Sequence, residues 1–120
     1  MDKKTLVLGA SLNTARYSNL AINRLVDKGK STVALGLRKG TVNGVEIETE
    51  KLPFENIHTI TLYLNAKRQK EYYDYIISLN PSRVIFNPGT ENPELYDILR
   101  NNNIAFENAC TLVMLSSQQY

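Results

Sequence analysis

Short apolar runs alternate with longer segments of helical periodicity along most of this chain. The runs are rich in Val, Ile and Leu, which is typical of buried β-strands. In the longer segments, apolar positions recur every three or four residues, as in helices with one buried face. The pattern predicts strands over about residues 5–8, 32–37, 59–64, 83–86 and 104–106. It predicts helices over about residues 17–28, 66–79 and 93–101, and a last helix that begins near residue 109.

This alternation predicts an α/β fold, a Rossmann-like doubly wound parallel sheet of about five strands in three layers. The first strand, helix and second strand suit a right-handed crossover between parallel strands. Residues 41–53 are expected to be irregular chain or a small hairpin turning at Asn43-Gly44. The chain has 120 residues, and we expect one domain over residues 1–120. The polar tail, residues 116–120, is expected to fray.

Small or charged residues follow several of the predicted strands. Doubly wound sheets bind ligands outside the carboxyl ends of their strands, where the strand order reverses. The segments expected at this edge are the Gly9 turn, Arg38-Lys39, Tyr63–Asn65 and Asn87–Glu91. The sequence therefore predicts one ligand site that is built from these loops.

Residues 6–18 have the order strand, small-residue turn and helix N-terminus. Such a helix end has free N–H groups and a positive dipole end, which suit it to holding a phosphate. The polar side chains that could bind phosphate oxygens here are Ser11, Asn13, Arg16 and Ser18. The alternative is a plain strand-to-helix connection, because the glycine fingerprint is incomplete. Gly9 matches its first glycine, but Ser11 and Thr14 stand where the other two would be.

Positive charge is concentrated in the first part of the chain. Residues 1–45 hold eight Lys or Arg and two Asp residues, a net charge of +6, while the remainder holds six against ten, a net of −4. NAD sites usually place an acid at the end of the second strand, where this chain has Arg38 and Lys39. These cations favour a ligand with an extra ribose phosphate, such as NADP or coenzyme A. Without the full glycine fingerprint, NADP is the less favoured of the two.

Composition limits the classes of function. The overall charge of +2 gives no case for nucleic-acid binding, and no apolar run approaches the roughly 20 residues needed to span a bilayer. The only cysteine, Cys110, excludes an internal disulfide and fits a reducing compartment. Met1–Lys4 lead directly into the first predicted strand, which leaves no room for a signal peptide. We therefore expect a cytoplasmic protein that acts neither on nucleic acid nor at a membrane.

Three motifs together resemble a known family. They are Gly9-Ala10-Ser11 with Asn13 and Ala15-Arg16-Tyr17-Ser18, then Phe86–Asn92, then Glu107–Leu115. In this combination the chain resembles the small single-domain bacterial CoA-binding proteins, whose fold is similar to the CoA-binding domain of succinyl-CoA synthetase. The resemblance covers nearly the whole chain. It departs from the family pattern at Leu37-Arg38, where an Asn-Pro pair is usual, and at Asn65-Ala66, which is often Pro-containing.

The resemblance implies a site for coenzyme A or an acyl-CoA. The residues implied at the pyrophosphate are Gly9, Ala10, Ser11, Asn13 and Arg16, within a motif that continues through Tyr17 and Ser18. Arg38 and Lys39 would meet the ribose 3′-phosphate. Tyr63 and Leu64 would flank the adenine. The residues implied nearer the pantetheine arm are Asn87, Pro88 and Gly89.

Catalytic residues are hard to find in this sequence. The one histidine, His58, precedes a strand, at the end of the sheet opposite the predicted site. Cys110, near a helix start, is either a thiol able to exchange with the CoA thiol or an inert packing residue. Glu91 and Glu107 have no base or nucleophile at a recognisable spacing. We expect a CoA-binding module without evident catalytic machinery, acting as a homodimer or with a partner enzyme; the alternatives are an NADP-dependent oxidoreductase and an interaction domain with a vestigial nucleotide site.

Overall fold

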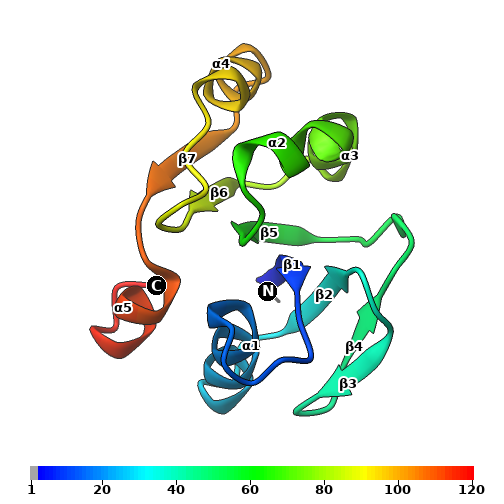
Figure 1. Ribbon diagram of the computed structural model, residues 1–120. Coiled ribbons are helices and arrows are strands. Elements are labelled where there is room, and N and C mark those ends of the chain that lie inside the picture. Colours follow the sequence, from blue (N-terminus) through cyan, green and yellow to red (C-terminus); the bar gives the residue numbers. More distant parts are fainter. Residues whose placement is uncertain (1–2) are drawn as a thin grey trace.

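The computed structural model of the protein describes residues 3–120 and contains one mostly parallel sheet (Figure 1). Its seven strands lie in the order β3-β4-β2-β1-β5-β6-β7, and only β3 runs antiparallel to its neighbour. The strands are β1 (Lys4–Ala10), β2 (Thr32–Gly36), β3 (Gly40–Val42), β4 (Val45–Glu48), β5 (Ile57–Leu62), β6 (Arg83–Phe86) and β7 (Ala105–Asn108). The helices are α1 (Tyr17–Asp27), α2 (Ala66–Gln69), the 3₁₀ segment η1 (Lys70–Tyr72), α3 (Tyr73–Leu79), α4 (Pro93–Asn101) and α5 (Thr111–Ser116).

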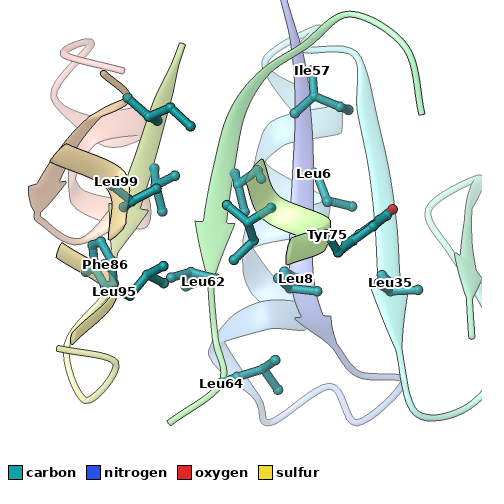
Figure 2. Packing of buried hydrophobic residues seen from close by; sticks show 14 residues of the cluster. Leu6, Leu8, Leu35, Ile57, Leu62, Leu64, Tyr75, Phe86, Leu95 and Leu99 are labelled. Atoms are coloured by element: carbon teal, nitrogen blue, oxygen red, sulfur yellow. The ribbon is translucent and has the colours of Figure 1, made fainter. Parts of the chain in front are cut away.

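The sheet has a layer of helices on each face (Figure 1). α1 and α5 cover one face, and α2, α3 and α4 cover the other. Side chains on β1 alternate between the two layers, as the pleat of a strand requires. Leu6 and Leu8 are buried with Leu95 and Leu99 of α4 (Figure 2), whereas Val7 is buried with α1 on the opposite face. The predicted three-layer α/β class is confirmed, because two apolar clusters lie on the two faces of one sheet.

The sheet has more strands than the expected five. The chain after β2 turns at Asn43-Gly44 into the hairpin of β3 and β4, with φ of 49° and 81° at the two turn residues. β4 then pairs in parallel with β2, so the hairpin extends the main sheet. Ile47 of β4 is fully buried in the cluster under α1. The small hairpin at Asn43-Gly44 is thus the alternative that the structure shows, and its pairing with the main sheet is an addition to the expected five strands.

Several expected boundaries also shift. The helix predicted over residues 66–79 is divided into α2, η1 and α3. β5 begins at Ile57 rather than at residue 59, and β7 begins one residue later than expected. The last helix begins at Thr111 with Cys110 as its N-cap. The expectation of no leader before β1 concerns Met1 and Asp2, which lie outside the described residues.

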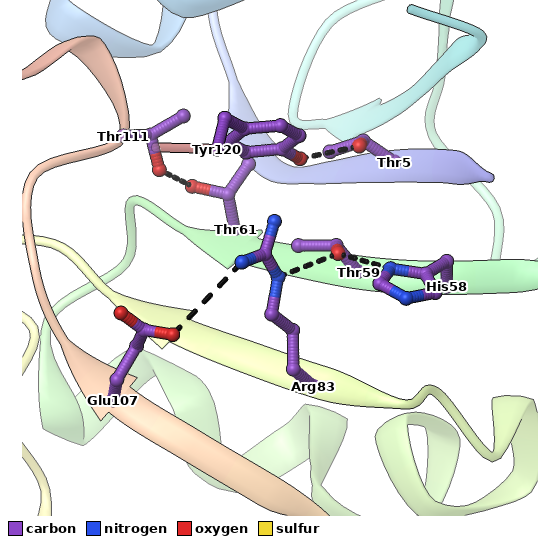
Figure 3. A network of polar contacts seen from close by, with 8 residues as sticks. All are labelled: Thr5, His58, Thr59, Thr61, Arg83, Glu107, Thr111 and Tyr120. Carbon is purple, nitrogen blue, oxygen red and sulfur yellow. Dashed lines mark hydrogen bonds and ion pairs between the residues drawn. The ribbon is translucent and has the colours of Figure 1, made fainter. Parts of the chain in front are cut away.

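The face of the sheet beneath α5 is polar. The hydroxyls of Thr61 and Thr111 are 2.8 Å apart, and both side chains are fully buried (Figure 3). Closer to the start of β1, the hydroxyl of Tyr120 bonds that of Thr5, and the guanidinium of Arg83 lies 4.6 Å from the centre of the Tyr120 ring. Contrary to the expectation for the tail, its last residue, Tyr120, packs against the sheet, while residues 116–119 are exposed.

Two glycines allow the end of β1 to lie close against both neighbouring strands. Gly9 has φ of +98°, and a Cβ atom there would lie 3.0 Å from the carbonyl carbon of Tyr63. Gly36 ends β2, and a Cβ atom there would overlap the carbonyl oxygen of Ala10. The pairing of β1 with β2 is irregular between Leu8 and Ala10, next to this contact. The absence of two side chains therefore lets the chain cross the carboxyl edge of the sheet without steric overlap.

We expect Gly36→Ala to destabilise the protein, because the new methyl group would overlap the Ala10 carbonyl, which is backbone and cannot rotate away. The expected loss in free energy of unfolding is about 1–3 kcal/mol, as for other overpacked sites. Urea unfolding followed by circular dichroism measures it. Thr41→Ala on the exposed hairpin serves as the control, with an expected change within about 0.5 kcal/mol. Equal stability of the two variants would contradict the close approach.

Candidate functional site

A cleft of about 740 Å³ lies at the carboxyl edge of the sheet. It follows the ends of β2, β1, β5 and β6, which are neighbours in that order. The strand order reverses at β1, since the chain continues to β2 on one side and returns through β5 on the other. The cleft thus occupies the position that doubly wound sheets use for ligands, and its volume falls in the range of roughly 300–1,000 Å³ that is usual for such sites.

The first wall of the cleft is the loop between β1 and α1. The backbone N–H of Asn13 donates to Ser11 Oγ at 3.0 Å, and that of Ala15 donates to Asn13 Oδ1 at 2.9 Å. The buried side chain of Asn19 donates to the carbonyl of Ser11 at 3.0 Å, which ties the loop to α1. The Ser11 hydroxyl hydrogen and the side-chain Nδ2 of Asn13 therefore remain available to donate to a ligand.

The N-terminus of α1 opens into this cleft. Its N-cap, Arg16, has an extended backbone and makes no side-chain capping bond, and the first turn holds no acid. Tyr17 and Ser18 follow as the first helical residues, and both line the cleft. Because the first N–H groups of a helix have no partner within it, this end presents donors and a positive dipole to the cleft.

The two cations after β2 have different surroundings. Arg38 lines the cleft. Lys39 does not, and its ammonium instead lies 3.6 Å from Glu48 Oε1 of β4. Of this expected pair, the structure brings only Arg38 to the cleft, because β4 carries a carboxylate beside Lys39.

The second wall is built by the ends of β5 and β6. It includes Tyr63, Leu64, Pro88 and Gly89, as expected. Asn87 is different, because its side chain is buried beneath the edge rather than in the cleft lining.

The Asn87 amide is used in bonds within the protein. Its Nδ2 donates to Thr61 Oγ1 at 2.7 Å and to the carbonyl of Leu62 at 2.8 Å. Its Oδ1 accepts from the Thr111 N–H at 2.9 Å. Asn87 therefore joins β5, β6 and the start of α5, and it supports the wall without lining it.

Asn65 and Thr90 also line the cleft, within the segments Tyr63–Asn65 and Asn87–Glu91 that were expected at this edge. Sequence reasoning missed other lining residues, which are Leu12, Leu35, Gly36, Leu37, Arg68 and Tyr72. Leu12 and Leu37 are large apolar side chains that are 43% and 69% exposed, which marks this rim as unusual. Asn65 caps α2 by accepting from the Arg68 N–H at 3.0 Å, a signal readable from the sequence. Arg68 itself was not foreseen, since a cation in a surface helix carries no distinguishing pattern.

The cleft is positively charged. Its lining contains the guanidinium groups of Arg16, Arg38 and Arg68, and within residues 3–120 it contains no carboxylate side chain. Tyr63 has a buried hydroxyl without a hydrogen-bond partner, and burial raises its pKa to about 12. The phenol is therefore neutral at physiological pH and adds no negative charge. This balance suits an anionic ligand.

The residues that the sequence analysis considered for catalysis, His58, Glu91 and Cys110, lie outside the cleft lining. His58 is on β5 at the opposite end of the sheet, with Nδ1 2.8 Å from Thr59 Oγ1, and burial lowers its pKa (Figure 3). Glu91 accepts from the N–H of Gly89 at 3.0 Å as a turn residue. Cys110 is half-buried at the N-cap of α5 and does not line the cleft. Residues 3–120 contain no cluster of His, Cys, Asp and Glu that could hold a metal ion.

None of the helices within the described residues is long and apolar enough to span a membrane.

Solved structures share this fold over most of its length. The crystal structure of a protein described as uncharacterized is 48% identical, has a TM-score of 0.95, and covers 100% of this chain and 99% of its own. A Thermus thermophilus protein is 16% identical with a TM-score of 0.87, and the match covers 99% of this chain and 91% of that protein's chain. A hypothetical protein from Pyrococcus horikoshii is 21% identical with a TM-score of 0.86, and the match covers 97% of this chain and 83% of that protein's chain. The last two show the fold alone.

A family model matches nearly the whole chain. No curated protein matches the chain significantly. The model of the CoA binding domain, however, matches residues 3–116, which include every element from β1 to α5. The chain therefore belongs to the CoA-binding domain family.

Proposed function

We propose that the protein binds coenzyme A or an acyl-CoA in the cleft at the carboxyl edge of the sheet. The observation that carries the proposal is the lining, which among the described residues has three guanidinium groups and no carboxylate. Coenzyme A carries a diphosphate and a ribose 3′-phosphate, so it needs several separated cations or N–H donors. The family assignment supports the same class of ligand.

The order of the strands suggests how the ligand lies. Arg38 follows β2, the α1 N-terminus follows β1, and Pro88 and Gly89 follow β6 at the far end. In the proposal, Arg38 meets the 3′-phosphate, and the loop from Gly9 to Ser18 holds the diphosphate. Tyr63 and Leu64, which follow β5 between β1 and β6, flank the adenine.

The pantetheine arm then runs toward the β6–α4 turn. Pro88, Gly89 and Thr90 line this end and carry no ionisable side chain, which suits the uncharged arm. Asn87 would not contact the arm itself, and its side chain would instead hold the backbone of Leu62 and Thr111 in place. We propose a module that carries or presents CoA, in the cytoplasm and to a partner enzyme, rather than one that transforms it.

We expect CoA to stabilise the folded protein. A ligand at one hundred times its Kd that binds only the folded state adds about 2.7 kcal/mol, which raises Tm by several degrees for a chain of this size. Thermal unfolding with CoA, NADP and NAD in parallel measures this. CoA should give the largest rise. A larger rise with NADP would favour an NADP-dependent enzyme, and no rise with any of them would favour a vestigial site.

Arg38→Ala should weaken CoA binding more than dephospho-CoA binding, because only CoA has the 3′-phosphate. Loss of a hydrogen bond to a charged group corresponds to a drop in affinity of about tenfold or more. Dephospho-CoA affinity should stay within about twofold of the wild-type value. Isothermal titration calorimetry measures both.

Lys39→Ala is the matched control, since Lys39 contacts Glu48 and lies outside the cleft lining. It should leave both affinities within about twofold, because exposed ion pairs contribute little. Equal losses of the two ligands in Arg38→Ala would show that Arg38 does not meet the 3′-phosphate.

A further inference from the structure

A buried amide lies behind the second wall of the cleft. Gln69, the last residue of α2, is 0% exposed. Its Nε2 donates to the carbonyl of Leu64 and to the carbonyl of Thr90, each at 2.8 Å. Its Oε1 accepts from Asn92 Nδ2 at 2.8 Å. Both donors and the acceptor of this side chain are therefore used inside the protein.

The two carbonyls belong to different segments of the wall. Leu64 follows β5, and Thr90 lies in the turn between β6 and α4; both line the cleft. Thr90 itself bonds through N–H and Oγ1 to Asn87 within the same turn. The other ties of the turn lie at its two ends, where Asn87 bonds Leu62 and Asn92 bonds Tyr73. Gln69 therefore joins two segments that β-pairing leaves unconnected beyond the ends of the strands.

A polar side chain at this position is not favoured by burial alone. An amide removed from water costs free energy unless its groups find partners, and an apolar side chain would not need them. The helix is interrupted immediately after Gln69, where α2 gives way to η1 and then α3. Gln69 therefore lies at the junction between α2 and η1, with its side chain bonded to two segments of the cleft wall.

We propose that Gln69 is a positioning residue that fixes the distance between the β5 end, which flanks the adenine in the proposed function, and the β6–α4 turn, which receives the pantetheine arm. The inference rests on the proposed function for the identity of the ligand. The tie between the two segments is a property of the free protein and can be measured without any ligand.

Gln69→Met tests the proposal, because methionine has a similar length and shape but cannot donate to either carbonyl. We expect the affinity for CoA, measured by calorimetry on the folded variant, to fall by about tenfold. We also expect the backbone N–H of Thr90 to exchange with solvent about tenfold faster in the absence of ligand, because the turn loses its tie to α2.

Tyr73→Phe is the matched control. The Tyr73 hydroxyl accepts from Asn92 Nδ2 at 2.8 Å and donates to Glu94 Oε1 at 2.9 Å, so the variant removes two bonds of the same network. The variant leaves the bonds to the carbonyls of Leu64 and Thr90 in place. Its CoA affinity and its Thr90 exchange rate should stay within about twofold of the wild-type values, even if its Tm falls.

Three outcomes would overturn the positioning role. They are wild-type CoA affinity in Gln69→Met, an unchanged Thr90 exchange rate in that variant, and equal losses of affinity in both variants. If the wild-type protein binds no CoA, the proposed function fails, and the exchange rates alone decide whether Gln69 ties the two segments.

Discussion

The cleft depends on a close approach of backbone to backbone at the carboxyl edge of the sheet. The chain leaving β1 passes over the ends of both neighbouring strands at Gly9 and Gly36, where a Cβ atom would meet Tyr63 on one side and Ala10 on the other. A side chain at either position would force the neighbouring backbones apart. The loop that leaves this closely packed edge leads to the α1 N-terminus, which lines the cleft and presents N–H groups suited to a phosphate.

Buried amides hold the second wall in a comparable way. Asn87 joins β5, β6 and α5, and Gln69 joins the β5 end to the β6–α4 turn. Neither side chain lines the cleft. The wall that a ligand would touch combines large side chains, such as Tyr63 and Leu64, with the small residues of the β6–α4 turn, while the amides that brace it lie one layer deeper. Amides suit this task because one side chain can donate and accept at once.

The fold was largely predictable, since the alternation of apolar runs and helical periodicity directly reflects a layered structure. The hairpin of β3 and β4 was harder to place, because its few apolar positions reveal their burial only when Ile47 packs under α1. The site was predictable as a set of loops at one edge. It was not predictable which side chains face the cleft: Lys39 turns to Glu48, and Asn87 turns inward to Thr61.

These exceptions have a common cause. The sequence shows which residues follow a strand, but the direction of a side chain depends on partners that come from distant segments. Glu48 becomes a partner of Lys39 only because β4 joins the sheet beside β2. Arg68 reaches the cleft from α2, whose last residue, Gln69, bonds the carbonyl of Leu64 at the end of β5. Long-range pairing therefore determines details that local patterns do not contain.

The most direct test of the central claim is a crystal structure of the protein grown with coenzyme A. The account predicts ligand density along the carboxyl edge of the sheet, with the 3′-phosphate at Arg38, the diphosphate at the α1 N-terminus and the pantetheine arm beside Gly89. Density for coenzyme A on another surface, or an empty cleft at saturating ligand concentration, would contradict it.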